Sequence, residues 1–435
     1  MPDAEPAIEP ERLGWSASAW ALFDFGYSLF AFVIFARYLG DWLITDLGHP
    51  DYYYTSAQAV AALALLILMP LSGVLADVMG RHVPLLAAFV AVAAGAGTLL
   101  SVISPDIGSL GVFPILALGT VSAIGTALAF AQFDPLLPSI APRRRWDSMS
   151  GYAVAAGYLG IVAWLVLLAD VIVGEDDKQA AFAPASLIFL VSAVPLLLLA
   201  RERRHPIDEP ILAGRFGTGL MRTAWRRMQF AIQRLRQHPQ ILRLLAGRFL
   251  YTDAVGTVNI YAIIYIGRVG DFSEREKNLI LLLVVACAGA GAIGSGWVSG
   301  LLGPRRTLLR IMPMFALGIA VVAIAGAPWT VWVLAPVVGI TLGTVYTVDR
   351  VFMLALTPPE LRGELFGFFN LIGRVAQALG PFVLWGGTIW LLHDATGWLS
   401  ALDASRVSLG LLAISTLLGL LVIRPLRDGT ERVAA

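Results

Sequence analysis

The sequence predicts an all-α polytopic membrane protein with twelve transmembrane helices in two six-helix halves. Of its 435 residues, 58% are hydrophobic and 14% are charged, whereas a soluble domain carries roughly 45–50% apolar and 25% charged residues. The mean hydropathy is +0.76. This composition excludes a soluble enzyme, a disordered regulator and a nucleic-acid-binding protein, and the net charge of +1 indicates no particular partner.

Twelve apolar stretches are long enough to span a bilayer, which takes about 20 mostly apolar residues per helix. They lie near 15–38, 55–76, 84–103, 112–136, 149–172 and 184–200, and near 241–267, 277–300, 307–326, 329–356, 364–390 and 405–423. The chain therefore divides into a tail (1–14), a first half (15–200), a linker (201–240), a second half (241–423) and a tail (424–435). The strand alternation typical of a membrane β-barrel is missing from the sequence.

Basic residues predict the orientation of these spans, because Lys and Arg accumulate on the cytoplasmic side of a membrane. Most of them fall in segments that are cytoplasmic if both termini are cytoplasmic, among them Arg143, Arg144, Arg145, Arg305 and Arg306. Five basic residues fall in segments on the external side of the membrane: Lys178, Arg268, Arg275, Lys277 and Arg406. The four that lie within spans are Arg37, Arg248, Arg350 and Arg374. We expect an integral protein of the bacterial cytoplasmic membrane with both termini in the cytoplasm.

The two halves repeat one another at matching places. Residues 80–86 (GRHVPLL) parallel residues 303–309 (GPRRTLL), and Asp24 in the first span corresponds to Asp253 in the seventh. Duplication around a cytoplasmic linker is typical of six-plus-six transporters, which bind substrate near the midplane between their halves.

The linker predicts a basic amphipathic helix. Its apolar stripe consists of Met221, Trp225, Met228, Ile232 and Leu235, and arginines surround that stripe. Such a helix lies on the anionic cytoplasmic leaflet. A plain surface connector is the favoured interpretation, and a regulatory partner site is the alternative.

The sequence indicates no cofactor and no metal. Cys287 is the single cysteine, so neither a disulfide framework nor a thiolate site is available, and the five histidines lack ligand spacing. The phosphate-binding pattern of ATP-driven pumps does not occur in the sequence.

Two motifs carry a family resemblance. Residues 73–82 (GVLADVMGRH) resemble the signature loop of the major facilitator superfamily, departing from it at Val78 and His82. Residues 20–28 (WALFDFGYS), 137–142 (LPSIAP) and 249–257 (FLYTDAVGT) are similar to the family of the yeast vacuolar amino-acid effluxer and its bacterial relatives. The resemblance implies the major facilitator fold, a cavity lined by the first, fourth, seventh and tenth helices, and, for the yeast member, export of neutral amino acids.

Ionisable residues inside spans are candidates for function, since a charge at the bilayer centre costs at least about 2.5–3.5 kcal/mol. Asp24 and Asp253 lie well inside their helices, so we expect them to load and release coupling protons. The alternative is a structural carboxylate paired permanently with Tyr251, Arg248 or a helix terminus.

Polar residues of the spans are candidates for the substrate cavity. Arg374 offers a guanidinium, which binds carboxylates bidentately, or else it neutralises Asp349 or Asp134. The other candidates are Tyr27, Gln132, Asn259, Tyr261 and Tyr346, each of which also suits an interhelical hydrogen bond.

Charged residues near the predicted cytoplasmic ends of the spans are candidates for gating. Asp134 and Arg350 occupy matching ends of the fourth and tenth spans and would close that side as a pair. Asp349 adjoins Arg350, so a local arrangement with Arg374 is the alternative. Asp77 and Arg81 of the signature loop would hold neighbouring helices in one state, or form a plain topogenic turn.

The prediction is a monomeric secondary transporter, not an enzyme, that moves a small polar or zwitterionic solute by alternating access, coupled to protons. Amino acids lead through the resemblance alone. One alternative is an exporter of amphiphilic, drug-like or lipid-like compounds. Another is a receptor or assembly factor built on a transporter scaffold.

Overall fold

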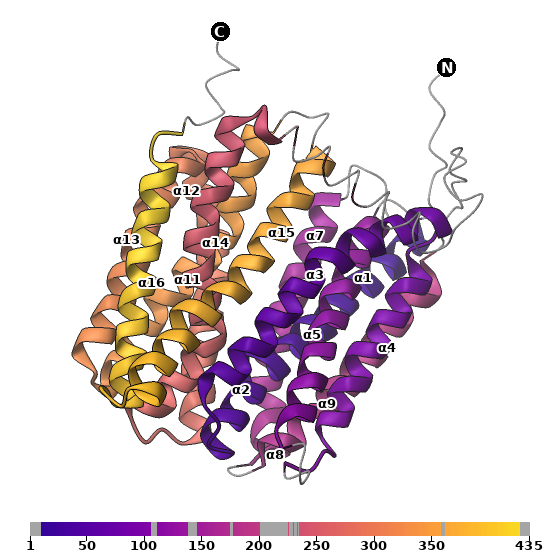
Figure 1. Ribbon diagram of the computed structural model, residues 1–435. Coiled ribbons are helices and arrows are strands. Elements are labelled where there is room, and N and C mark those ends of the chain that lie inside the picture. The colour runs from indigo at the N-terminus through magenta and orange to yellow at the C-terminus, as the bar shows by residue number, and fades with distance from the viewer. Residues whose placement is uncertain are drawn as a thin grey trace. The chain divides into compact units, whose positions relative to one another are not determined.

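The computed structural model describes most of the chain. The described residues are 10–105, 111–137, 146–174, 177–200, 225, 229, 233, 235–357 and 362–426. Twelve helices in these ranges are long and apolar enough to cross a membrane, as the sequence predicts (Figure 1). Of the predicted linker helix, Trp225 is exposed and Leu235 is buried; the other residues of its stripe lie outside the described residues, as does the loop that carries Arg143, Arg144 and Arg145.

Helical segments follow one another with short connections. The first group is α1 (Pro10–Ala31), η1 (Phe32–Tyr38), α2 (Leu39–Asp41), η2 (Trp42–Asp46), α3 (Asp51–Met79), α4 (Val83–Leu100), α5 (Phe113–Phe133), η4 (Asp134–Leu136), α7 (Trp146–Ala163), η6 (Trp164–Leu168), α8 (Ala169–Ile172), η7 (Lys178–Ala181) and α9 (Phe182–Leu199). The second group is α11 (Pro239–Val269), α12 (Glu274–Leu302), α13 (Pro304–Ala325), α14 (Pro328–Leu356), α15 (Arg362–Gly380), η9 (Pro381–Gly387), η10 (Trp390–Ala395) and α16 (Ala401–Ile423).

Local sequence explains where the helices begin and end. Ser273 and Glu276 form a capping box at the start of α12, each side chain bonding the other residue's backbone N–H. Ser400 accepts a bond from the Asp403 N–H at the start of α16. Gly303 has a φ of +82°, which allows α12 to end and α13 to begin directly at Pro304.

Several spans contain π-helical turns. They occur in the first span at η1 and η2, in the fifth at η6 and in the eleventh at η9 and η10. Such turns within α-helices are frequent at functional sites. The fifth and eleventh spans occupy equivalent places in the sequence repeat, so this irregularity is itself repeated.

Contacts between residues divide the chain into two compact units. Unit 1 comprises Met1–Leu39 and Ile67–Arg226, and unit 2 comprises Gly40–Leu66 and Arg227–Ala435. The segment 40–66, which holds η2 and the first half of α3, therefore belongs to unit 2.

Four helix pairings recur in both units. In unit 1, α1 packs against α7 and α9, and α4 packs against α5 and α9. In unit 2, α11 packs against α15 and α16, and α13 packs against α14 and α16. Figure 1 shows α13 and α16 running side by side. In unit 1, α1, α4, α5, α7 and α9 are spans 1, 3, 4, 5 and 6. In unit 2, α11, α13, α14, α15 and α16 are spans 7, 9, 10, 11 and 12. Each of these pairings in unit 1 is therefore repeated six spans later in unit 2.

Candidate functional site

Asp24 lies on α1 in the interior of unit 1. Its side chain is buried, at 7% exposure, and it accepts a hydrogen bond from Ser28 Oγ one turn later at 3.4 Å. Asp134, on η4, lies near enough to interact electrostatically with Asp24. The two predicted acids of unit 1 therefore share one region.

Aromatic rings surround this part of α1. Phe23 stacks on Phe133 with ring centroids 4.4 Å apart, and Tyr27 stacks on Phe130 at 4.7 Å. Phe189 of α9 meets both Phe23 and Tyr27 edge to face. Phe23, Phe133 and Phe189 are buried, whereas Tyr27 and Phe130 are half-buried, so the Tyr27–Phe130 pair is the accessible face of this cluster.

Small residues let the neighbouring helices approach α1 closely. A Cβ at Gly160 of α7 would overlap the backbone carbonyl of Phe25, and one at Gly157 would lie 2.5 Å from Ser28 Oγ. Gly26 of α1 likewise faces Ser192 of α9. This close packing fixes the turn of α1 that carries Asp24.

Gln132, predicted as a cavity residue, is part of a buried polar network. Its Oε1 lies 2.8 Å from His82 Nδ1, and its Nε2 donates to Ser72 Oγ at 3.2 Å. The network connects the end of α5 with α3 and with the start of α4.

Asp253 lies on α11 in the interior of unit 2 and corresponds to Asp24 in the repeat. Thr257 Oγ1 donates to its carboxylate at 3.3 Å. The carboxylate faces Gly380 of α15 so closely that a Cβ there would overlap it. The glycine thus makes room for the carboxylate between two packed helices.

Asp349, predicted as a gating residue, forms a buried charged cluster in unit 2. Arg248 Nε donates to its Oδ2 at 2.5 Å, and the Tyr251 hydroxyl donates to its Oδ1. Arg248 Nη1 also donates to the Phe369 carbonyl at 2.7 Å, and its Cζ lies 3.7 Å from the centroid of the Phe369 ring. The cluster joins α11, α14 and α15. Arg248 and Tyr251, which the sequence suggested as partners of Asp24 or Asp253, are bonded to Asp349 instead.

The remaining predicted residues are spread over both units. Tyr261 is buried between the rings of Tyr54 and Trp385. Arg374 is half-buried, and Asn259, Tyr346, Arg81, Asp134 and Arg350 are exposed. The Asp77 side chain lies outside the described residues. Asp134 belongs to unit 1 and Arg350 to unit 2, and their pairing stays a prediction.

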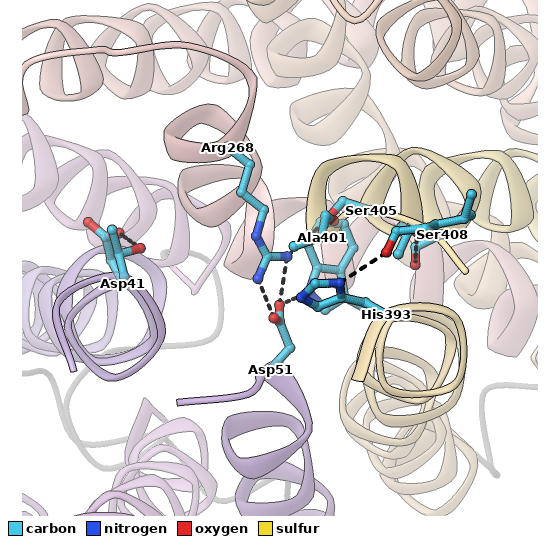
Figure 2. A network of polar contacts seen from close by, with 11 residues as sticks. Asp41, Asp51, Arg268, His393, Ala401, Ser405 and Ser408 are labelled. Atoms are coloured by element: carbon cyan, nitrogen blue, oxygen red, sulfur yellow. Dashed lines mark hydrogen bonds and ion pairs between the residues drawn. The ribbon is translucent and has the colours of Figure 1, made fainter. Parts of the chain in front are cut away.

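A second polar cluster of unit 2 lies at the helix ends that the charge pattern predicts to be external. Asp51, the first residue of α3, forms a bidentate ion pair with Arg268 of α11. Trp385 Nε1 donates to Asp51 Oδ1 at 2.9 Å, and Arg268 Nη1 donates to Ser405 Oγ at 2.9 Å. Figure 2 shows Arg268 and Asp51 pointing toward one another, with the His393 ring beside the carboxylate.

Lys277 and Asp41 form a neighbouring pair in the same layer. Lys277 Nζ lies 3.8 Å from Asp41 Oδ2 and 2.8 Å from Glu274 Oε1, and Thr45 donates to Asp41 at 2.8 Å. Both clusters bind residues of the segment 40–66 to α11 and α12. They explain why this segment belongs to unit 2.

We expect Arg268→Met to lower the free energy of unfolding by about 3 kcal/mol, because it leaves the buried Asp51 carboxylate without its ionic partner. Thermal unfolding of the purified protein in detergent measures this effect. Arg275→Met is the matched control, since Arg275 is exposed and a surface substitution changes stability by about 0.5 kcal/mol or less. Equal losses in the two variants would contradict the assignment.

Sequence reasoning missed the partners rather than the charges. Arg248 and Asp349 were visible as charges within spans, but they lie 101 residues apart in the chain and pair only through helix packing. Asp51 precedes the predicted second span, 55–76, and was not among the predicted site residues. Among the described residues, no group of three His, Cys, Asp or Glu side chains could hold a metal ion.

The sequence profile of the Major Facilitator Superfamily matches residues 15–381. The chain belongs to the Major Facilitator Superfamily. Membership of this family makes it a membrane transporter rather than an enzyme, as the sequence predicts, and implies a small-molecule substrate.

Relatives confirm the narrower resemblance as well. The uncharacterised MFS-type transporter YxiO of Bacillus subtilis is 22% identical over 405 residues, which cover 86% of this chain and 88% of the relative. Autophagy-related protein 22-1 of Penicillium rubens is 22% identical over 258 residues, or 54% of this chain and 43% of that protein. The chain thus spans less than half the length of this fungal relative. These matches agree with the resemblance to the group that includes the vacuolar amino-acid effluxer.

Solved structures of other major facilitator proteins show the same fold. A mutant of the nucleoside transporter NupG superposes with a TM-score of 0.71 at 10% identity, covering 95% of this chain and 99% of that one. A bacterial homologue of the human lysosomal transporter Spinster superposes with a TM-score of 0.67 at 14% identity, covering 97% and 98%. The predicted twelve-helix major facilitator fold is therefore confirmed.

Proposed function

We propose that this protein is a secondary active transporter that couples the movement of its solute to the movement of protons through Asp24 and Asp253. The observation that carries the proposal is the contrast between two kinds of buried carboxylate. Asp349 and Asp51 each have an arginine partner, whereas among the described residues Asp24 and Asp253 each bond only to a hydroxyl one turn away. A carboxylate without a fixed counter-charge is free to alternate between its protonated and ionised forms.

The proposed solute is small and polar or zwitterionic, with amino acids as the leading class. The similarity to autophagy-related protein 22 supports this class, at 22% identity. Arg374, half-buried on α15, supplies a cation for a carboxylate group. The accessible aromatic pair Tyr27 and Phe130 favours a second candidate, an exporter of amphiphilic compounds, because aromatic faces bind apolar and cationic groups.

The proposed setting is the bacterial cytoplasmic membrane, with both termini in the cytoplasm. The transporter is proposed to act as a monomer. The basic linker would rest on anionic lipids. Gating would rest on Asp77, Arg81, Asp134 and Arg350 near the cytoplasmic ends of the helices, and on the Asp51–Arg268 pair at the opposite ends. Alternating access would require this last pair, which ties α3 to α11, to open and reform in each cycle.

Purified protein in liposomes with an imposed pH gradient and an internal pH dye tests the proposal. Amino acids, peptides, sugars and lipophilic cations are added in turn. We expect a solute-dependent proton flux for at least one class, amino acids first. A solute flux that neither dissipates nor responds to the pH gradient would replace coupling by facilitated diffusion. No flux of any solute in folded protein would favour a receptor or assembly role.

A further inference from the structure

We propose that Asp24, Tyr27 and Phe130 form a binding site for the ammonium group of an amine-bearing solute, which displaces the proton from Asp24. This inference rests on the proposed function and deepens it, because it names the substrate class and the way coupling arises. It gives Asp24 two ligands that exclude each other, a proton and an organic ammonium ion.

The first argument is the unused bonding capacity of the Asp24 carboxylate. A carboxylate offers about four lone-pair sites to donors, and Asp24 uses one of them, for the 3.4 Å bond from Ser28. An ammonium group brings up to three N–H donors and a positive charge. It therefore completes both the hydrogen bonding and the charge of a carboxylate that is 7% exposed.

The second argument is the charge of the surrounding helices. The elements packed against α1 are α7 and α9, and α5 joins them through the Phe23–Phe133 and Tyr27–Phe130 stacks. The sequences of these three helices contain no Lys, Arg or His. Their charged and titratable groups are Asp147, whose side chain lies outside the described residues, the tyrosines Tyr152 and Tyr158, and, at the end of α5, Asp134.

Two cations of unit 1, Arg37 and His82, contact other groups. Arg37 follows Asp24 by 13 residues in the chain, about 20 Å along a helix, and its Cζ lies 4.4 Å from the centroid of the Tyr38 ring. His82 bonds to Gln132. Among the described residues, the charged groups shown to interact with Asp24 are therefore acidic, so the region attracts a cation and repels the carboxylate end of a solute.

The third argument concerns the type of cation. Hard metal ions such as Ca²⁺ require six or more oxygen ligands, whereas the hydrogen-bonding neighbour described for the Asp24 carboxylate is a single hydroxyl, that of Ser28. Tyr27 lies one turn from Asp24 on α1, and its ring stacks on that of Phe130 of α5 at 4.7 Å. Both rings are half-buried. A carboxylate beside aromatic faces is suited to an alkylammonium ion.

Competition follows from this geometry. The carboxylate neutralises either a proton or an ammonium ion, so binding of the amine releases the proton when Asp24 is protonated. In a transport cycle such a site exchanges the two, which would make the coupling an antiport. Below the titration midpoint of Asp24, the apparent affinity for an amine would fall up to tenfold for each unit of decreasing pH.

Proton release on ligand addition tests the inference in detergent solution with weak buffer and a pH dye. The probes form matched sets: L-leucine, 3-methylbutylamine, which lacks the carboxylate, and 4-methylpentanoate, which lacks the amine; L-phenylalanine, 2-phenylethylamine and 3-phenylpropanoate extend the series. We expect saturable binding of amines with release of up to one proton per site and no binding of the deaminated acids. Equal binding of the acids, or no binding by any amine, overturns the inference.

Variants separate recognition from folding. Asp24→Asn is expected to abolish amine binding and proton release, Asp24→Glu to retain both, and Tyr27→Leu and Phe130→Leu to weaken binding about tenfold. Asp170→Asn and Tyr152→Leu are the matched controls, because both residues are exposed in unit 1. Folding is checked by size-exclusion chromatography and thermal unfolding. Undiminished amine binding by folded Asp24→Asn overturns the site.

The two proposals fail in different ways. Flux driven by a pH gradient for a solute without an amine would leave the proposed function standing and overturn the ammonium site. Amine binding with proton release, but no gradient-driven flux in liposomes, would support the ammonium site and overturn proton-coupled transport.

Discussion

Arg248→Met is expected to lower the free energy of unfolding by about 3–5 kcal/mol, the cost of breaking a buried ion pair by removing one partner. The substitution leaves the Asp349 carboxylate, which is 2% exposed, with the Tyr251 hydroxyl alone. It also removes the donor to the Phe369 carbonyl and the cation over the Phe369 ring. The contacts that Arg248 of α11 makes with α14 and with α15 are lost together.

Thermal unfolding in detergent measures this loss, and Arg243→Met provides the control. Arg243 lies on the same helix and is exposed, so its replacement changes charge and volume equally without uncovering a buried carboxylate. The double variant Arg248→Met with Asp349→Leu is expected to recover much of the stability, because an apolar pair of similar volume replaces the charges. If Arg248→Met were as mild as Arg243→Met, the cluster would not hold these helices together.

Asp24→Asn is expected to reduce transport driven by a pH gradient to background while the protein stays folded. Asparagine has nearly the shape of aspartate and still accepts the bond from Ser28, but it neither binds a proton nor carries a charge. A single residue that must be protonated and deprotonated in each cycle cannot be replaced by one that does neither. Liposome flux with an internal pH dye measures the loss.

Asp170→Asn is the matched control for this experiment, since it removes an exposed carboxylate of unit 1. The same assay applied to Asp253→Asn shows whether the second unpaired carboxylate shares the role. Proton-coupled flux of wild-type size in Asp24→Asn would reject Asp24 as the coupling residue. If Asp253→Asn keeps proton-coupled flux and Asp24→Asn loses it, coupling is assigned to Asp24 alone.

The spans were predictable because hydrophobic length is a local property. A bilayer imposes a minimum run of apolar residues, so each of the twelve candidate helices of the structure overlaps one of the twelve predicted stretches, the largest difference being at the end of the first span, predicted near 38 and found at Asp46. The repeat was also visible, through 80–86 and 303–309, and the packing of α1 and α11 repeats with it. Asp24 and Asp253 stood out because charges inside spans are rare.

The partners of charged residues were not predictable in the same way. Asp349 was expected in a local arrangement with Arg350 and Arg374, and instead it meets Arg248 and Tyr251 of α11. Asp51 was counted with the first half of the chain, but its partners Arg268 and Trp385 lie in the second. Helical periodicity places a residue on one face of its helix, but it does not say which helix covers that face.

The sequence by itself therefore determined the membrane-spanning elements, the duplication and the short set of intramembrane charges. Tertiary structure decided which of those charges are neutralised, joining Arg248 to Asp349 and leaving Asp24 and Asp253 with hydroxyl partners only, among the described residues. The physical reason is distance. Whether a segment spans the bilayer depends on the apolar residues within that one helix. An ion pair between helices depends on the rotation and spacing of two helices that are far apart in the chain.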